Sequence, residues 1–130
     1  QYNDRYGHQA GDDCVRAIAA LIRQMESDQI FCARYGGDEF VIIYSGMSAE
    51  EVCERAEKLR QDVMALQIEQ RYAEGSFGVT ISQGICHDIP SNGNKNWDFL
   101  HVADQALYRV KRRGRNRLCM TDIHGREIEV

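Results

Sequence analysis

The chain has 130 residues, of which 43% are hydrophobic and 28% are charged, and it contains a single proline. These values are typical of one globular domain spanning residues 1–130, and they exclude a disordered tail, a collagen or a multidomain enzyme. With 16 Lys and Arg against 20 Asp and Glu, the net charge is -4. Because an acidic chain lacks the cationic surface of a nonspecific nucleic-acid binder, any phosphate that it binds must be held by a local cluster.

Hydropathy and cysteine spacing further narrow the class of protein that the chain can be. The longest apolar runs, 17–22 and 40–44, are far shorter than the roughly 18 residues that cross a bilayer, so no membrane span is expected. The first residues, QYNDR, include no initiator Met and no apolar signal region, which indicates a piece of a longer protein. The five cysteines form no C-x-x-C pair. This spacing argues against a zinc site or a disulfide framework and favours reduced thiols in the cytoplasm.

The first half of the chain predicts a helix and a hairpin. Apolar residues recur at helical spacing from Asp12, which indicates an amphipathic helix on a core. Its apolar positions are Val15, Ile18, Ala19, Ile22 and Met25. Two β-rich runs, 30–35 and 40–44, are separated by G-G-D-E, and glycine supplies the positive φ angles of a tight connection. We therefore expect a β-hairpin with two acidic residues in its turn.

A second helix is expected to begin at Ser48, because Ser48 and Glu51 have the spacing of a capping box. Its apolar stripe is Val52, Ala56, Leu59 and Val63. The run 77–86 is expected to form one strand. Its face of small residues, Thr80, Ser82 and Gly84, could lie under a helix or a ligand. The segment 88–96, with three Asn, a Pro and a Gly, is expected to be a loop.

A third helix is expected after that loop, ending in basic residues and Gly114, a typical C-terminal stop. Its apolar positions are Leu100, Ala103, Leu107 and Val110. Trp97 and Phe99 at its start are interpreted as core anchors. Residues 117–120 predict a last strand, to which 121–130 could add a hairpin arm. Helices alternating with a mostly antiparallel set of strands predict an α+β sandwich, a sheet flanked by helices.

The hairpin turn is the first candidate site. Asp38 and Glu39 follow Gly36 and Gly37, and carboxylate oxygens on a short tether suit Mg²⁺, which also binds waters and substrate phosphates. The two glycines allow a nucleotide to approach the backbone. An ordinary polar turn explains the same residues, since Gly and Asp are common in turns.

The segment 3–12 is a second candidate, interpreted as a loop with two glycines ahead of the first helix. An amide and a carboxylate that converge, Asn3 and Asp12, can recognise the edge of guanine. Taken alone, Asp12 is explained more simply as the N-cap of the helix.

The third candidate is K-R-R-G-R-N-R at 111–117, with five cations in seven residues. Its functional interpretation is a triphosphate clamp, in which Lys acts as a point charge and Arg as a bidentate fork. The alternative is a solvated helix end whose cations complement the helix dipole.

Four motifs in this order resemble the GGDEF family of diguanylate cyclases, and together they cover nearly the whole chain. They are N-D-x-x-G-H-x-x-G-D at 3–12, G-G-D-E-F at 36–40, an S-x-G-type strand at 76–85, and D-x-A-L-Y-x-x-K-x-x-G-R-N-R at 104–117. The resemblance implies a nucleotidyl-cyclase-like α/β sandwich of the ferredoxin-like, or palm, type. It also implies the joining of two GTP molecules into cyclic di-GMP, with release of two pyrophosphates.

The resemblance assigns roles at the matching positions. Asp38 would be a ligand of Mg²⁺ or Mn²⁺ and a possible base near the attacking 3′-hydroxyl, and Glu39 would support the same charge site. Asn3 and Asp12 would bind guanine. Gly36 and Gly37 would let the phosphates lie against the turn, and Lys111 and Arg115 would hold the triphosphate.

The resemblance also implies partners. Each protomer of the family binds one GTP, so a face-to-face homodimer is needed for turnover, and an upstream sensory or regulatory domain usually brings the two copies together. The alternative is an inactive GGDEF module that binds GTP or docks a partner. The intact signature at 36–40 speaks against that alternative, because degenerate members usually lose it.

The sequence departs from the family pattern in two places. The family's first strand, with a D-x-D-x-F-K pattern, would end just before Gln1, so that strand, its metal-binding Asp and a phosphate-binding Lys are expected to be absent from this chain. The family's product-inhibition motif, R-x-x-D, is replaced by Ser27 and Ile30. We therefore expect no feedback inhibition through that site, and a tight cyclic di-GMP complex there would contradict this expectation.

Overall fold

The computed structural model describes residues 2–36, 39–66, 69–72, 75–78, 80–90 and 96–129. The chain divides into two compact units, one formed by Gln1–Met47 and Gln61–Val79 and the other by Ser48–Arg60 and Thr80–Val130. Both units combine helix with paired strands. The predicted α+β class is therefore confirmed.

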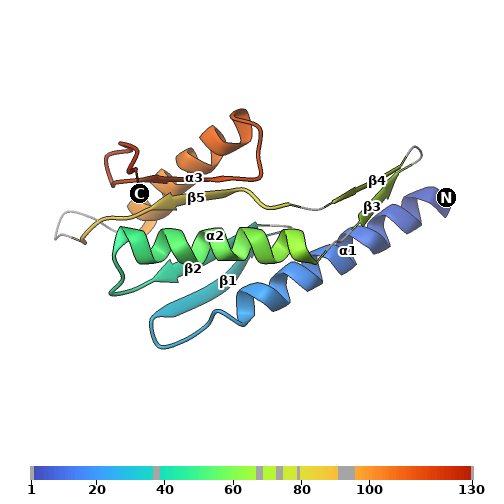
Figure 1. Ribbon diagram of the computed structural model, residues 1–130, viewed down its shortest axis with the longest axis horizontal. Coiled ribbons are helices and arrows are strands. Elements are labelled where there is room, and N and C mark those ends of the chain that lie inside the picture. Colours follow the sequence, from blue (N-terminus) through green and yellow to red (C-terminus); the bar gives the residue numbers. More distant parts are fainter. Residues whose placement is uncertain are drawn as a thin grey trace. The chain divides into compact units, whose positions relative to one another are not determined.

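The first unit contains the helix α1 (Tyr2–Arg23) and the antiparallel hairpin of β1 (Ile30–Gly36) and β2 (Glu39–Tyr44) (Figure 1). A second antiparallel pair, β3 (Glu69–Tyr72) and β4 (Gly75–Gly78), follows later in the chain. Helix α1 contacts both β1 and β3. The buried apolar residues of this unit are Cys14, Ile18, Ile22, Ile30 and Val63.

Helix α1 begins ten residues before the predicted start at Asp12, so two expectations are wrong: the segment 3–12 is not a loop, and Asp12 is not an N-cap. Within this segment Gly7 and Gly11 weaken a helix most, each by about 1 kcal/mol relative to Ala. Once a helix has nucleated, each further residue adds a backbone hydrogen bond. Elongation from the amphipathic part of α1 therefore outweighs the two glycines.

The second unit is built on a parallel pair, β5 (Gln83–Cys86) and β6 (Leu118–Thr121), joined through the helix α3 (Asn96–Arg112). Figure 1 shows α3 alongside the two strands, and contacts between α3 and both strands are extensive. The first part of α2 (Ala49–Ala65) belongs to this unit. Its buried apolar residues are Val52, Ala56, Leu59, Val102, Ala106, Val110, Cys119 and Met120.

The capping box at the start of α2 is formed as predicted. The Glu51 backbone N–H donates to Ser48 Oγ at 3.1 Å, and the Ser48 N–H donates to Glu51 Oε1 at 3.3 Å. The predicted apolar stripe of this helix is buried at all four positions. The sequence therefore predicted both the start of α2 and its buried face.

The single strand predicted over 77–86 is wrong. Its two ends belong to different ladders, because β4 pairs with β3 while β5 pairs with β6. Residues 80–82 between them are not in a strand, and the backbone N–H of Asn116 donates to Ser82 Oγ at 3.1 Å. The β-rich composition marked both segments correctly but carried no information about their partners.

The small-residue face of β5 lies under α3, as one of the two predicted alternatives proposed. A Cβ added at Gly84 would lie 2.1 Å from the backbone nitrogen of Leu107 and 2.3 Å from the carbonyl oxygen of Ala103. Only a glycine permits this approach of helix to strand. Trp97, predicted as a core anchor, is instead 64% exposed, because the buried stripe of α3 begins at Val102.

Beyond β6 the chain turns back as a short arm. Thr121 and Glu127 form an isolated antiparallel bridge, and the Ile128 N–H donates to the Met120 carbonyl at 2.8 Å. The Asp122 carboxylate closes the turn by accepting the N–H groups of His124 and Arg126. The predicted hairpin arm is therefore present, although it extends the sheet by a single bridge only.

Candidate functional site

The hairpin of β1 and β2 positions the acidic candidates. Its ladder runs from the pair Ile30–Tyr44 to the pair Gly36–Glu39, with a register shift between Arg34 and Gly36. Such an irregularity twists a hairpin locally and re-aims the residues next to it. Glu39 is exposed at the start of β2. Gly37 and Asp38 lie outside the described residues, so their predicted roles stay predictions.

The guanine candidates Asn3 and Asp12 both lie on α1. They are nine positions apart, which corresponds to about two and a half helical turns. Their side chains are outside the described part of the structure, so the predicted pairing of amide and carboxylate is not tested by it.

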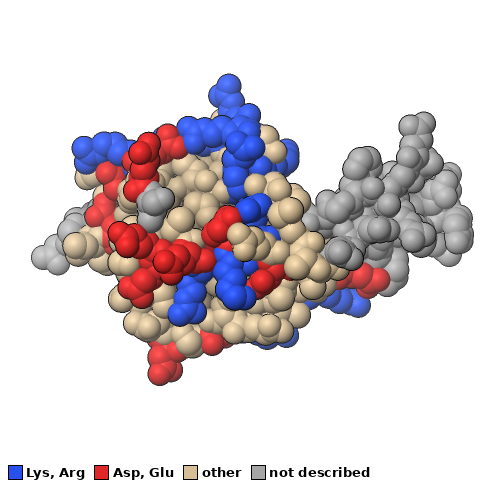
Figure 2. All heavy atoms as spheres, in the orientation of Figure 1, with Lys and Arg blue, Asp and Glu red and all other residues tan. Residues whose placement is uncertain are grey.

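The phosphate candidates lie at the C-terminal end of α3 and in the turn that follows. Lys111 is exposed in the last helical turn, and Arg115 is exposed just beyond it. Figure 2 shows Lys and Arg side chains gathered over this end of α3. These exposed cations share one end of the helix, where the carbonyl ends of the dipole favour positive charge.

The helix ends in a Schellman motif, as the position of Gly114 predicts. The Arg115 N–H donates to the Val110 carbonyl at 3.0 Å, and Gly114 has a φ of 110°. Arg115 and Asn116 follow with φ values of 66° and 50°. Three successive residues thus have positive φ, although only the first is a glycine.

The turn 114–116 is held by residues that the sequence patterns did not single out. Arg60 Nη1 on α2 donates to Asn116 Oδ1 at 3.0 Å, and Ser82 Oγ accepts the Asn116 N–H. Glu57 in turn accepts two hydrogen bonds of 2.7 Å from Arg60, through Nε and Nη2. The i,i+3 spacing of Glu57 and Arg60 was visible in the sequence, but nothing there pointed to Asn116.

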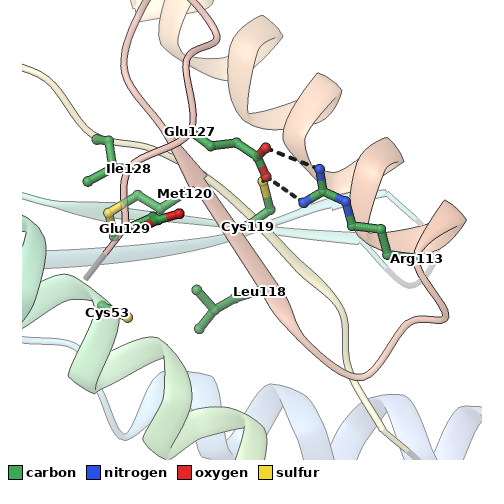
Figure 3. A pocket seen from close by; sticks show the side chains of 8 residues that line it. All are labelled: Cys53, Arg113, Leu118, Cys119, Met120, Glu127, Ile128 and Glu129. Carbon is green, nitrogen blue, oxygen red and sulfur yellow. Dashed lines mark hydrogen bonds and ion pairs between the residues drawn. The ribbon is translucent and has the colours of Figure 1, made fainter.

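A cavity of about 400 Å³ lies between the first part of α2, β6 and the C-terminal arm. It is lined by Cys53, Arg113, Leu118, Cys119, Met120, Glu127, Ile128 and Glu129. Figure 3 shows Arg113 reaching from the end of α3 to Glu127 on the arm, where the guanidinium and carboxylate form two hydrogen bonds. This ion pair fastens the arm to the same helix end that carries Lys111.

The pKa shifts of this unit follow from these contacts. Hydrogen bonds from Arg113 and from the Cys119 thiol lower the pKa of Glu127 to about 2. Burial raises the pKa of the Cys86 thiol to about 11 and also raises the pKa of Cys119, Cys14, Cys32 and Cys53. All five cysteines are free thiols. Since a raised pKa leaves little thiolate at neutral pH, none of them is a candidate nucleophile.

The described ranges contain neither a clustered metal site nor a membrane-spanning helix. No group of three or more His, Cys, Asp or Glu side chains there could hold a metal ion. Among the same residues, no helix has the length and apolar character needed to span a membrane.

The two α+β units, one with the glycine-acid hairpin and the other with the basic helix end, are of the nucleotidyl-cyclase-like class. The family model described as "Diguanylate cyclase, GGDEF domain" matches residues 1–117. The chain belongs to this family, and the resemblance recognised from its four motifs is confirmed.

Individual relatives support the assignment of the chain to this family. A diguanylate cyclase from Vibrio cholerae is 36% identical, and the match covers 91% of this chain and 35% of the relative. The structure of the coiled coil and GGDEF domain of DgcB from Caulobacter crescentus, in complex with c-di-GMP, has a TM-score of 0.79 and 33% identity, covering 92% of this chain and 62% of that one. The active GGEEF domain of a diguanylate cyclase from Vibrio cholerae has a TM-score of 0.73 and 32% identity, covering 91% and 72%. The chain spans only 25% to 35% of the length of three curated relatives that it matches.

Proposed function

We propose that this chain is a catalytic domain that condenses two GTP molecules into cyclic di-GMP. The observation that carries the proposal is the intact G-G-D-E-F signature at 36–40 in a member of the GGDEF family whose hairpin ladder closes at the Gly36–Glu39 pair. Glu39 of the signature is exposed at the start of β2, where a substrate can reach it.

The proposed reaction consists of two nucleotidyl transfers. In each, the 3′-oxygen of one GTP forms a bond to the α-phosphorus of the other. The bond from that phosphorus to the bridging oxygen of the β-phosphate breaks, and pyrophosphate leaves. The proton of the 3′-hydroxyl passes to a base, for which Asp38 is the candidate. Two such steps close the ring and release two pyrophosphates. Such transfers depend on in-line positioning and charge stabilisation more than on covalent intermediates.

The site residues are proposed by their match to the family motifs. Asn3 and Asp12 read the guanine, Gly36 and Gly37 lie against the phosphates, and Lys111 and Arg115 hold the triphosphate. The exposure of Lys111 and Arg115 at one helix end supports their part, since Lys offers a point charge and Arg a bidentate fork.

Asp38 and Glu39 fit a divalent cation such as Mg²⁺ or Mn²⁺, because adjacent carboxylates offer the hard oxygen ligands that these ions prefer. When bound, the cation supplies positive charge to the phosphate oxygens. The residues of this chain orient the two substrates and accept the proton.

A homodimer completes the proposed site, because each phosphodiester joins two GTP molecules and each chain carries one set of binding residues. We propose that an upstream sensory or regulatory domain controls this pairing, and that the reaction takes place in the cytoplasm.

The test is chromatographic detection of cyclic di-GMP after incubating the full-length protein with GTP and Mg²⁺. We expect product from the wild type and a loss of at least about 100-fold in turnover for Asp38→Ala, the scale seen when one charge-stabilising group is removed. The matched control, Asp28→Ala, removes another acidic residue of the same unit, exposed beside β1, and should keep its turnover. GTP binding without product would favour the inactive module, and no binding at all would overturn both interpretations.

A further inference from the structure

The turn 114–116 adopts a backbone conformation that its own sequence does not favour. Arg115, with a φ of 66°, bears a long side chain in the left-handed region, where the Cβ of an L-residue crowds the backbone. Asn116, with a φ of 50°, tolerates that region better because its short amide bonds locally. A residue keeps an unfavourable backbone conformation only when the contacts around it fix that conformation. Such residues cluster at functional sites.

The surroundings that fix this turn are side chains from two other elements. Ser82, just before β5, accepts the N–H of Asn116, and Arg60 on α2 donates to its amide oxygen. The Arg60 side chain is 19% exposed, and Glu57 holds its guanidinium through two short hydrogen bonds. Because the Glu57 carboxylate binds one edge of the Arg60 guanidinium, the other edge is oriented toward the amide oxygen of Asn116.

A second set of contacts fixes the turn at its two ends. The Arg115 N–H is bonded to the Val110 carbonyl, and the Arg115 carbonyl accepts Nε of Arg117 at 3.0 Å. The backbone of Arg115 is therefore bonded on both sides, and its neighbour Asn116 is tied to α2. No hydrogen bond within the turn itself holds Asn116 in place among the contacts described.

We infer that Arg60, oriented by Glu57, is a positioning residue for triphosphate binding: through Asn116 it holds the left-handed turn that presents Arg115. This inference rests on the proposed function, because Arg115 is assigned there to the triphosphate. Arg60 touches no substrate in this scheme. Its effect is to keep the competent conformation of the turn populated before GTP arrives.

The size of the effect follows from the population of that conformation. Apparent affinity falls in proportion to the fraction of protein in the binding-competent state. Releasing a turn with left-handed Arg115 and Asn116 from its tether should lower that fraction to on the order of one tenth. The affinity for the triphosphate should fall by the same factor, and the rate at saturating GTP should not change.

The test compares Arg60→Met, which keeps the aliphatic stem, with the wild type in the full-length protein. We expect the KM for GTP, and the Kd for an α,β-methylene analogue of GTP, to rise about tenfold with kcat within about twofold. Amide hydrogen exchange should accelerate at Asn116, whose N–H is bonded to Ser82. In the Arg115→Ala background, Arg60→Met should add little, because the Arg115 side chain through which Arg60 acts is already absent.

The matched control is Arg126→Met, which removes another arginine of the same unit that is paired with a carboxylate, that of Asp122. It should leave the KM and the exchange at Asn116 unchanged. An Arg60→Met protein that unfolds more readily but has wild-type KM, Kd and exchange at Asn116 would show a merely structural role and overturn the inference. If the wild type itself fails to bind GTP, the proposed function is overturned first, and the positioning role falls with it.

Discussion

The two strand pairs β1–β2 and β5–β6 are brought together in different ways. The partners of the hairpin are two residues apart in the chain and pair antiparallel, whereas β5 and β6 pair in parallel across the whole of α3. The residues of the turn are enough to predict the antiparallel hydrogen bonding of the hairpin. The parallel pair depends on a long crossover and on a helix that lies close to the strand at Gly84. Local pairing is readable from sequence, and crossover pairing requires the tertiary structure.

Replacing Gly84 by Ala should break the crossover pair and give the largest loss of stability. The added Cβ would meet backbone atoms of Leu107 and Ala103 at 2.1 and 2.3 Å, so α3 must shift away from β5. We expect a loss of about 3 kcal/mol or more in the free energy of unfolding, at or above the upper end for overpacked cores. Chemical denaturation followed by circular dichroism measures it.

Gly46→Ala, just beyond the hairpin, is the matched comparison. Gly46 has a φ of 68°, and an added Cβ would lie 3.2 Å from Nε2 of Gln29, the end of a flexible side chain. We expect a loss of only about 1 kcal/mol, from the left-handed backbone. Equal losses for the two variants would contradict the distinction drawn between the two strand pairs.

Ser48→Ala should have a smaller effect, because it breaks a purely local device. The Oγ of Ser48 caps the N–H of Glu51 at the start of α2, and removing such a cap typically costs about 1 kcal/mol. Thermal unfolding should show this loss, with little change on Ser48→Thr, which can keep the cap. A loss as large as that of Gly84→Ala would mean that Ser48 does more than cap the helix.

The weakest contact in this series is the exposed ion pair of the C-terminal arm, and it should depend on pH. Because the pKa of Glu127 is lowered from 4.5 to about 2, its pairing stabilises the folded state fully above about pH 4.5 and is lost as the pH falls toward 2. The difference in melting temperature between the wild type and Glu127→Gln should shrink over that range.

Glu129→Gln removes a negative charge two residues further along the same arm and serves as the control for net charge. The same pH dependence in both comparisons would show that overall charge, and not the pair with Arg113, stabilises the arm.

The sequence by itself determined the local features of this protein. The capping box of Ser48 and Glu51, the hairpin at the glycine-acid signature and the stop at Gly114 each depend on residues within a few positions of one another. The four ordered motifs also sufficed to recognise the family, because they preserve residue types at fixed spacings.

The tertiary structure alone decided the contacts between distant segments. It separated 77–86 into two strands with different partners, left Trp97 exposed, and tied Asn116 to Arg60 across 56 positions of the chain. These outcomes depend on which surfaces meet after the chain folds. Propensity and periodicity describe only how a segment can bury its own apolar face, so they cannot specify its partner.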